Sequence, residues 1–245
     1  MTDNLSNPHS STPIGAGKPE TAGTGLYGFM RRGIGFLLHL FAEVHIEGVE
    51  RLPAEGALLP VSNHLSYMDP LLVLIAIPRR MRAFAARKYR ANLFLRWWFD
   101  SMGCIWVRQA EADPHALRAA LEFLHAGGAL GLSPEGTRSK TTHALGRARS
   151  GVAYLASRSG ASILPIAVWG TETLLRDVLH LRRGKLHLRI GPPFRLEIPP
   201  HTKGAPLDDA TDDIMCAIAA LLPPQYRGVY ADHPRLAQWL RRMNP

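Results

Sequence analysis

The chain has 245 residues, with 29 Lys and Arg against 20 Asp and Glu and a formal net charge of +9 at pH 7. This length suits one domain with a substantial core, and the charge predicts an anionic partner such as a membrane surface or a CoA-like substrate. Two cysteines are too few for a disulfide framework, and the histidines do not have the spacing of a metal-binding motif. The sequence also lacks the basic run with interleaved aromatic residues that would indicate nucleic-acid binding.

The N-terminal region divides into a polar arm and an apolar segment. Residues 1–25 are rich in Ser, Thr, Gly and Pro, which is typical of a disordered arm. Residues 26–42 are apolar but contain Arg31 and Arg32, whereas a spanning helix needs roughly 20 mostly uncharged residues. We predict an amphipathic helix in the membrane interface, with its aromatic residues toward the bilayer and its arginines toward the headgroups. The alternative is a helix that packs on the protein's own core.

From residue 43 onward, strand-like apolar runs alternate with helical stretches. This alternation predicts a single layered α/β domain at residues 43–230, with a largely parallel mixed sheet flanked by helices, followed by a C-terminal tail at 231–245. Glycines end two of the helices, and an apolar stripe marks the last helix as amphipathic. The predicted strands are 44–48, 57–62, 81–86, 104–107, 129–132, 163–168 and 186–190, and the predicted helices are 71–77, 89–102, 114–126, 151–159 and 208–222.

Residues 62–70, with the sequence SNHLSYMDP, combine an imidazole with a carboxylate five positions later. His64 could take a proton from an alcohol, and Asp69 on its other ring nitrogen would fix the tautomer. A regular helix would set the two residues roughly 140° apart, so a turn must bring them together, with Asp69 near the N-cap and Pro70 opening a helix. No G-x-S-x-G motif occurs, so the attacking hydroxyl is expected to come from a substrate. The alternative is a capping Asp beside an ordinary loop His.

Residues 134–139, with the sequence PEGTRS, follow the strand-like run at 129–132. The Pro and Gly predict a strand that ends in a tight loop, and loops at strand ends are where α/β proteins place their chemistry. Arg138 can bind phosphate with a bidentate fork, and Gly136 allows close approach of the backbone. Glu135 is expected to orient Arg138 or to accept a hydrogen bond from a substrate hydroxyl. The alternative is a surface turn with one solvated ion pair, which would be worth little.

Taken together, these two blocks resemble the glycerolipid acyltransferases of the lysophosphatidate acyltransferase type. Two weaker blocks, residues 103–108 and 163–168, follow in the family's order, and the resemblance runs from about residue 48 to residue 191. One departure concerns the family's second motif, where the usual Arg is replaced by Gln109 and Arg108 stands one position earlier. A second departure is Ser133, where an aromatic or apolar residue usually precedes Pro-Glu-Gly.

The resemblance implies an O-acyltransferase that moves a fatty acyl group from acyl-CoA or acyl carrier protein to the free hydroxyl of a lysophospholipid. The first candidate acceptor is 1-acylglycerol-3-phosphate, which would give phosphatidate in phospholipid biosynthesis. His64, oriented by Asp69, would deprotonate the hydroxyl. No metal or other cofactor is expected, because a thioester is already activated. The residues expected to bind substrate are Glu135, Gly136, Thr137 and Arg138, together with Arg108.

The net charge, the apolar segment at 26–42 and the resemblance together predict a protein that associates with an anionic membrane surface at its cytoplasmic face, and the pattern of basic residues predicts no nucleic-acid binding. Acyl carrier protein is a further candidate partner. Three alternatives stay open. The acceptor could be another lysolipid, such as an aminolipid precursor. The protein could instead be a lipid or thioester hydrolase, or a basic membrane-binding protein without activity.

Overall fold

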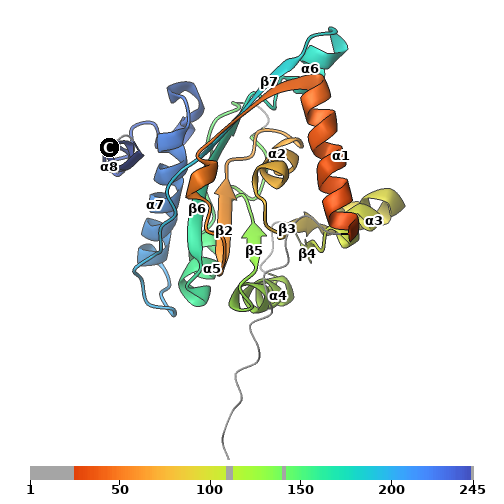
Figure 1. The fold of residues 1–245 in the computed structure, drawn as a ribbon. Helices are drawn as coiled ribbons and strands as arrows, with labels where there is room; N and C mark the ends of the chain where they lie inside the picture. Colours follow the sequence, from red (N-terminus) through yellow and green to blue (C-terminus); the bar gives the residue numbers. More distant parts are fainter. Residues whose placement is uncertain (1–24, 109–112, 140–141, 244–245) are drawn as a thin grey trace, which may run out of the picture.

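The computed structural model describes residues 25–108, 113–139 and 142–243, so most of the predicted N-terminal arm and Gln109 lie outside the described residues. Seven strands form one sheet in the order β1-β7-β6-β2-β5-β3-β4 (Figure 1). Neighbouring strands are parallel except for β6 and β7, which are antiparallel. This arrangement confirms the single α/β domain with a largely parallel sheet. The strands are β1 (Ala42–Glu47), β2 (Leu58–Ser62), β3 (Met81–Ala86), β4 (Ile105–Val107), β5 (Ala129–Gly131), β6 (Ser162–Trp169) and β7 (Gly184–Ile190).

Helices cover both faces of the sheet, and the alternation of side chains along each strand separates two cores. In β2, Leu59 joins the core under α4, α5, α7 and α8, whereas Leu58 joins the core under α1 and α2. In β6, Ile163 and Leu164 divide in the same way. Both cores are therefore built on one central sheet. The helices are α1 (Gly25–Phe41), α2 (Asp69–Ala76), α3 (Leu93–Ser101), α4 (Pro114–His125), α5 (Gly151–Ser159), α6 (Leu174–Leu179), α7 (Ala205–Leu221) and α8 (Leu236–Met243).

The structure differs from the predicted elements in three places. The predicted helix at 89–102 is split, because the Asn92 side chain accepts a hydrogen bond from the Leu95 N–H at 3.0 Å and starts α3 after a 3-10 turn. The short helix α6 was not predicted. The segment predicted as a tail contains α8, whose Trp239 is 2% exposed and donates its indole N–H to Asp213 on α7 at 2.7 Å. Helix α8 therefore belongs to the core of the domain.

Helix α1 has two apolar faces rather than one apolar and one charged face. One face, which includes Tyr27 and Ile34, is buried against α2 and the sheet, as the core-packing alternative expected. Arg31 does not point toward a headgroup layer, because it donates to the carbonyls of Leu74 and Ile75 at the end of α2. Over the described ranges, no helix combines the length and apolar character needed to cross a bilayer. The other face of α1 leaves six large apolar side chains exposed: Leu26, Phe29, Phe36, Leu37, Leu40 and Phe41.

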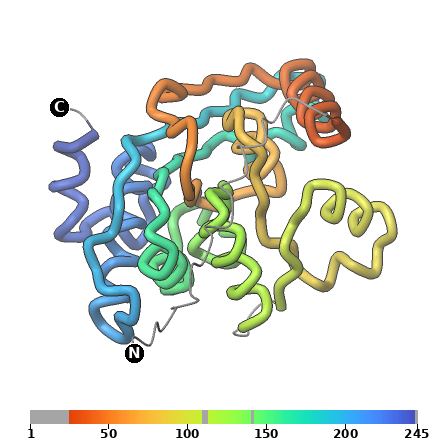
Figure 2. Tube along the Cα trace, turned by 60° about the horizontal axis from the view of Figure 1, so that its bottom comes forward, coloured from red at the N-terminus to blue at the C-terminus, as the bar shows by residue number. Residues whose placement is uncertain are grey.

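Helix α3 protrudes from the body of the domain on the same side as α1, as the yellow and red segments of the trace in Figure 2 show. Its exposed residues include Leu93, Phe94 and Trp97. Large apolar side chains are therefore exposed on two helices on this side of the molecule.

Candidate active site

The candidate site lies at the carboxyl edge of β6, β2 and β5, which are neighbours in the middle of the sheet. Asn63 follows β2, and its side-chain amide donates to the Val168 carbonyl at 2.7 Å and accepts from the Val168 N–H at 2.8 Å. The buried side-chain amide of Asn63 thus forms with β6 the pair of hydrogen bonds that a strand backbone would form. It anchors the start of the turn that carries His64 and Asp69.

The predicted contact between His64 and Asp69 is present. His64 Nδ1 lies 3.0 Å from Asp69 Oδ2. A carboxylate can only accept, so Nδ1 carries the proton and the lone pair of Nε2 is left for a substrate. The His64 side chain is 23% exposed and that of Asp69 is 1% exposed. The imidazole therefore reaches the surface while the carboxylate that orients it is shielded from water.

Asp69 is held by more groups than the sequence indicated. Its Oδ2 also accepts from the N–H groups of Leu65 at 2.6 Å and Ser66 at 2.7 Å. Its Oδ1 accepts from the Thr171 hydroxyl, which follows β6 and is buried. Asp69 lies near the N-cap of α2 as predicted, since Met68 is the N-cap and Asp69 is the first helical residue. Its side chain points back into the turn instead of capping the helix.

Sequence reasoning missed Thr171. It lies 102 residues after Asp69, and a hydroxyl after a strand is too common to single out. The one available signal was its position just beyond the predicted strand at 163–168, at the same sheet edge as His64. Because β6 lies next to β2 in the sheet, Thr171 is brought into direct contact with Asp69.

Glu135 joins the two sequence blocks. Its carboxylate accepts the N–H of His64 at 3.0 Å on Oε1 and the N–H of Gly146 at 3.0 Å on Oε2. The residue is 5% exposed, and burial raises the pKa of this carboxyl above its ordinary value although both N–H groups and the nearby His64 oppose the shift. The expected pairing with Arg138 is wrong, since no ion pair joins the two among the described residues. Both carboxylate oxygens face backbone N–H groups.

Arg138 lies instead against Tyr67 of the first block. Its Nη2 donates to the Tyr67 hydroxyl at 2.7 Å, and its Cζ lies 3.4 Å from the centre of the Tyr67 ring. The backbone strengthens this contact between the blocks, because the Ser139 N–H donates to the His64 carbonyl at 2.9 Å. Arg138 is thus placed beside the turn of His64 by an exposed tyrosine. The Arg138 guanidinium is therefore held by an exposed partner and not by a buried one.

The other predicted binding residues differ in position. Gly136 and Thr137 are exposed in the loop before Arg138, and Gly136 has a φ of +65°, which favours glycine. Arg108 follows β4, the edge strand, and β3 separates β4 from β5. Its backbone N–H donates to Asp113 at 3.3 Å. The structure therefore brings Gly136, Thr137 and Arg138 to the dyad and leaves Arg108 farther along the sheet edge.

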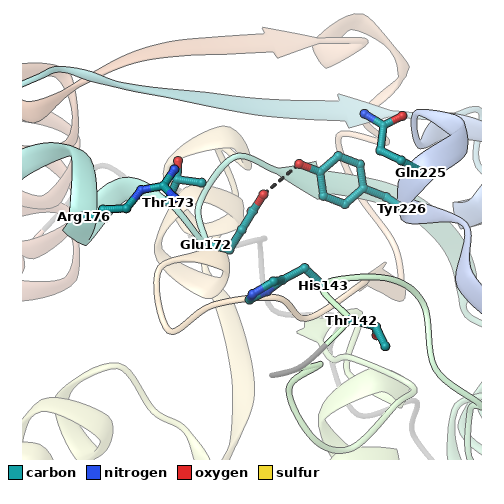
Figure 3. Close-up of a pocket in the computed structure, with 7 residues that line it drawn as sticks. All are labelled: Thr142, His143, Glu172, Thr173, Arg176, Gln225 and Tyr226. Atoms are coloured by element: carbon teal, nitrogen blue, oxygen red, sulfur yellow. Dashed lines mark hydrogen bonds between the residues drawn. The ribbon is translucent and has the colours of Figure 1, made fainter.

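A cavity of about 400 Å³ opens near the dyad, and none of the predicted site residues lines it (Figure 3). Its wall comes from the segment after β6, from the loop that follows the second block, and from the 3-10 turn after α7. Sequence reasoning gave no sign of this cavity, because the three segments are far apart along the chain. The lining residues are Thr142, His143, Glu172, Thr173, Arg176, Gln225 and Tyr226.

Residues 43–169, which contain both blocks, match the sequence model of the Acyltransferase family. The chain belongs to this family. It is 26% identical over 141 residues to the chloroplastic 1-acyl-sn-glycerol-3-phosphate acyltransferase LPAT1 of Arabidopsis thaliana, a match that covers 56% of this chain and 39% of that protein. It is 22% identical over 170 residues to the 1-acyl-sn-glycerol-3-phosphate acyltransferase of Bacillus subtilis, covering 69% of this chain and 82% of that protein. The chain thus spans well under half of the Arabidopsis relative.

The fold is similar to a crystal structure of PlsC, the 1-acyl-sn-glycerophosphate acyltransferase of Thermotoga maritima. The TM-score is 0.60 at 24% identity, with 77% of this chain and 76% of that chain covered. At this identity the likeness concerns the fold alone. It agrees with the layered α/β architecture described above.

Proposed function

We propose that this protein transfers a fatty acyl group from a thioester, acyl-CoA or acyl carrier protein, to the free hydroxyl of a lysophospholipid. The observation that carries the proposal is the His64–Asp69 pair, with its protonated Nδ1 turned inward and its Nε2 available at the surface. Membership in the Acyltransferase family and the activity named for the relatives support it. The first acceptor we propose is 1-acylglycerol-3-phosphate.

The proposed reaction is one displacement at the thioester carbonyl. The acceptor hydroxyl donates to His64 Nε2, and as its oxygen attacks the carbonyl carbon the proton moves to the imidazole. Asp69 stabilises the imidazolium that forms, as the acid does in a serine hydrolase. The C–S bond then breaks, and the leaving thiolate takes the proton from the imidazolium. An ester and a free thiol result, with no acyl-enzyme and no metal or further cofactor in the proposed step.

Arg138 is proposed to bind the acidic group of the acceptor, because its guanidinium lies in the same surface region as His64 and is stacked on Tyr67. A planar guanidinium suits the two oxygens of a phosphate. Thr137 lies in the same exposed loop and offers a backbone N–H group and a hydroxyl, whereas the Gly136 N–H already donates to the Ser133 carbonyl at 3.1 Å. Glu135 is not part of this proposed contact, since its oxygens already accept two backbone N–H groups.

The test of the activity is a donor-by-acceptor matrix with the purified full chain in mixed micelles. Labelled acyl-CoA and acyl-acyl carrier protein are each offered to 1-acylglycerol-3-phosphate, to other lysolipids and to water alone. We expect a labelled diacyl product with at least one lysolipid. Release of free fatty acid with no diacyl product would support a hydrolase instead. Vesicle binding without turnover of any thioester would support the alternative of a basic membrane-binding protein that has no enzymatic activity.

We also propose that the exposed apolar face of α1 binds an anionic membrane surface at the cytoplasmic face. Phe29 and Phe36 are each 69% exposed, and the net charge of +9 favours anionic lipids. The double substitution Phe29→Ser and Phe36→Ser should weaken co-sedimentation with anionic vesicles while leaving the fold intact. Deleting α1 is a poorer test, because its other face is buried in the core. Unchanged vesicle binding would place the contact elsewhere on the protein.

A further inference from the structure

The cavity beside the dyad is built from residues that the proposed transfer does not use. Glu172, Thr173 and Arg176 come from the segment after β6, and Gln225 and Tyr226 from the 3-10 turn after α7. In Figure 3, Glu172 points toward Tyr226, while Arg176 lies to the left of Glu172 and His143 lies below the pair. The lining therefore combines one carboxylate and one guanidinium with other polar groups.

Both walls of the cavity are connected to the dyad by short steps. Glu172 follows Thr171, whose hydroxyl donates to Asp69. On the opposite wall, the Thr142 hydroxyl lies 3.0 Å from Ser139 Oγ, and the Ser139 N–H donates to the His64 carbonyl. A lysolipid whose hydroxyl meets His64 would thus have this cavity beside the reacting group. The location suits the polar headgroup of an acceptor.

The Glu172 carboxylate has one oxygen occupied and one unpaired. Its Oε1 accepts the Tyr226 hydroxyl at 2.7 Å. Burial, with the bond to Glu172, raises the pKa of Tyr226 to about 12, so this hydroxyl stays protonated and donates. The other carboxylate oxygen, Glu172 Oε2, is buried and has no hydrogen-bond partner among the described residues. A buried carboxylate oxygen without a donor is unfavourable, and solvent does not reach this oxygen in the structure. Because Glu172 lines the cavity, a ligand N–H or O–H group can pair with this oxygen once the side chain turns toward the cavity.

The charges on the walls narrow the chemical class of that ligand. A ligand with acidic groups only would meet the Glu172 carboxylate unfavourably, whereas a ligand with an ammonium group alone would face the Arg176 guanidinium. A headgroup with both an ammonium and an acidic group satisfies both sides, with the ammonium at Glu172 and the acid toward Arg176. We propose that this cavity binds the headgroup of a lysolipid acceptor that carries a primary ammonium together with an acidic group.

This inference rests on the proposed acyl transfer and adds a preference among acceptors. It predicts that Glu172 raises the efficiency with amine-bearing lysolipids and does nothing for acceptors without an amine. Lysophosphatidate, which has no ammonium group, would leave Glu172 Oε2 without a donor. The residue that sets acceptor preference would then lie outside both sequence blocks, in the segment after β6.

The experiment compares four acceptors with one acyl chain and one thioester donor. Lysophosphatidylserine carries an ammonium, a carboxylate and a phosphodiester, and lysophosphatidylethanolamine carries an ammonium and a phosphodiester. Lysophosphatidylglycerol and 1-acylglycerol-3-phosphate carry no amine. Glu172→Gln should lower kcat/KM for the two amine-bearing acceptors by about tenfold or more, and change it by less than about twofold for the others. Glu50→Gln, at an exposed position on the 3-10 turn after β1, serves as the matched control.

Tyr226→Phe separates the charge of Glu172 from its hydrogen bond and should keep the preference for amines, because the carboxylate remains. Circular dichroism checks that each variant is folded. An equal loss with all four acceptors, or no loss with any, would overturn the inference. A wild-type protein that acylates only the acceptors without an amine would overturn it too, while leaving the proposed transfer standing. A wild-type protein that acylates none of the four with either acyl-CoA or acyl-acyl carrier protein would refute the proposed transfer itself.

Discussion

The turn after β2 and the loop after β5 meet at one site but are held in different ways. In the turn, Asp69 accepts four hydrogen bonds, from two backbone N–H groups, the His64 ring and the Thr171 hydroxyl. In the loop, Arg138 is held by stacking on an exposed tyrosine and by one hydrogen bond to its hydroxyl. The base is therefore fixed before substrate arrives, whereas the cation keeps freedom to adjust.

This difference follows from what each group is proposed to do. Proton transfer needs the imidazole within hydrogen-bond distance of a hydroxyl and in one tautomer, so a rigid turn lowers the cost of reaching the transition state. Binding an anionic headgroup tolerates several orientations of a guanidinium. Substitutions in the turn should therefore lower kcat, and substitutions of Arg138 should act mainly on KM for the acceptor.

The largest effect is expected for His64→Ala. Loss of the base should lower kcat by about 10²–10⁴-fold, the range typical of general acid–base catalysis. The melting temperature should change little, because Asp69 keeps its three other donors. Steady-state kinetics and thermal unfolding measure the two quantities, with His125→Ala at an exposed position of α4 as control. Near-normal kcat in a folded His64→Ala protein would rule out the proposed base.

Asp69→Asn should lower kcat by about 10²-fold, because the amide no longer holds His64 in the required tautomer. It should also lower the free energy of unfolding by about 2 kcal/mol, since an amide cannot accept from every donor that surrounds Asp69. Urea denaturation alongside kinetics separates these two effects. A loss of stability with unchanged kcat would mean that Asp69 serves the turn and not the reaction.

Arg138→Ala should raise the KM for the acceptor by about tenfold, a typical loss for a hydrogen bond to a charged group. The KM for the donor should stay within about twofold, and Arg138→Lys should recover only part of the loss because a point charge cannot form a fork. Varying each substrate at a fixed level of the other gives both constants. A selective increase in the donor KM would assign this loop to the thioester carrier instead.

The smallest effect concerns Glu135, which holds the turn and the loop together. Its pKa is raised in the folded protein, so its contribution to stability is largest below the unfolded pKa and falls as pH rises through the folded pKa. Glu135→Gln cannot titrate, and the stability gap between wild type and variant should narrow as pH rises from 4 toward 8. Urea denaturation across this range measures the gap. A gap that widens with pH would mean that the folded pKa is lowered rather than raised.

Local patterns in the sequence were enough for the layers and for the dyad. The alternation of apolar runs predicted the strands, because each strand and helix has its own period of side-chain direction. His64 and Asp69 could be paired because they are five residues apart in a turn between a strand and a helix. The predicted ion pair between Glu135 and Arg138 was wrong because it relied on the same kind of local pattern. Neighbours in the sequence were matched by opposite charge, whereas the buried carboxylate turned to backbone N–H groups that no sequence pattern displays.

What only the tertiary structure decided was which distant groups share a site. The sheet places β6, β2 and β5 side by side although they are far apart in the chain, so Thr171 reaches Asp69 and Glu135 reaches His64. The cavity around Glu172 arises in the same way, from three segments that meet at one sheet edge. Side-chain chemistry and short spacing are properties of the sequence itself. Contacts between strand ends depend on the order of the strands, which is set by the packing of helices on both faces of the whole sheet.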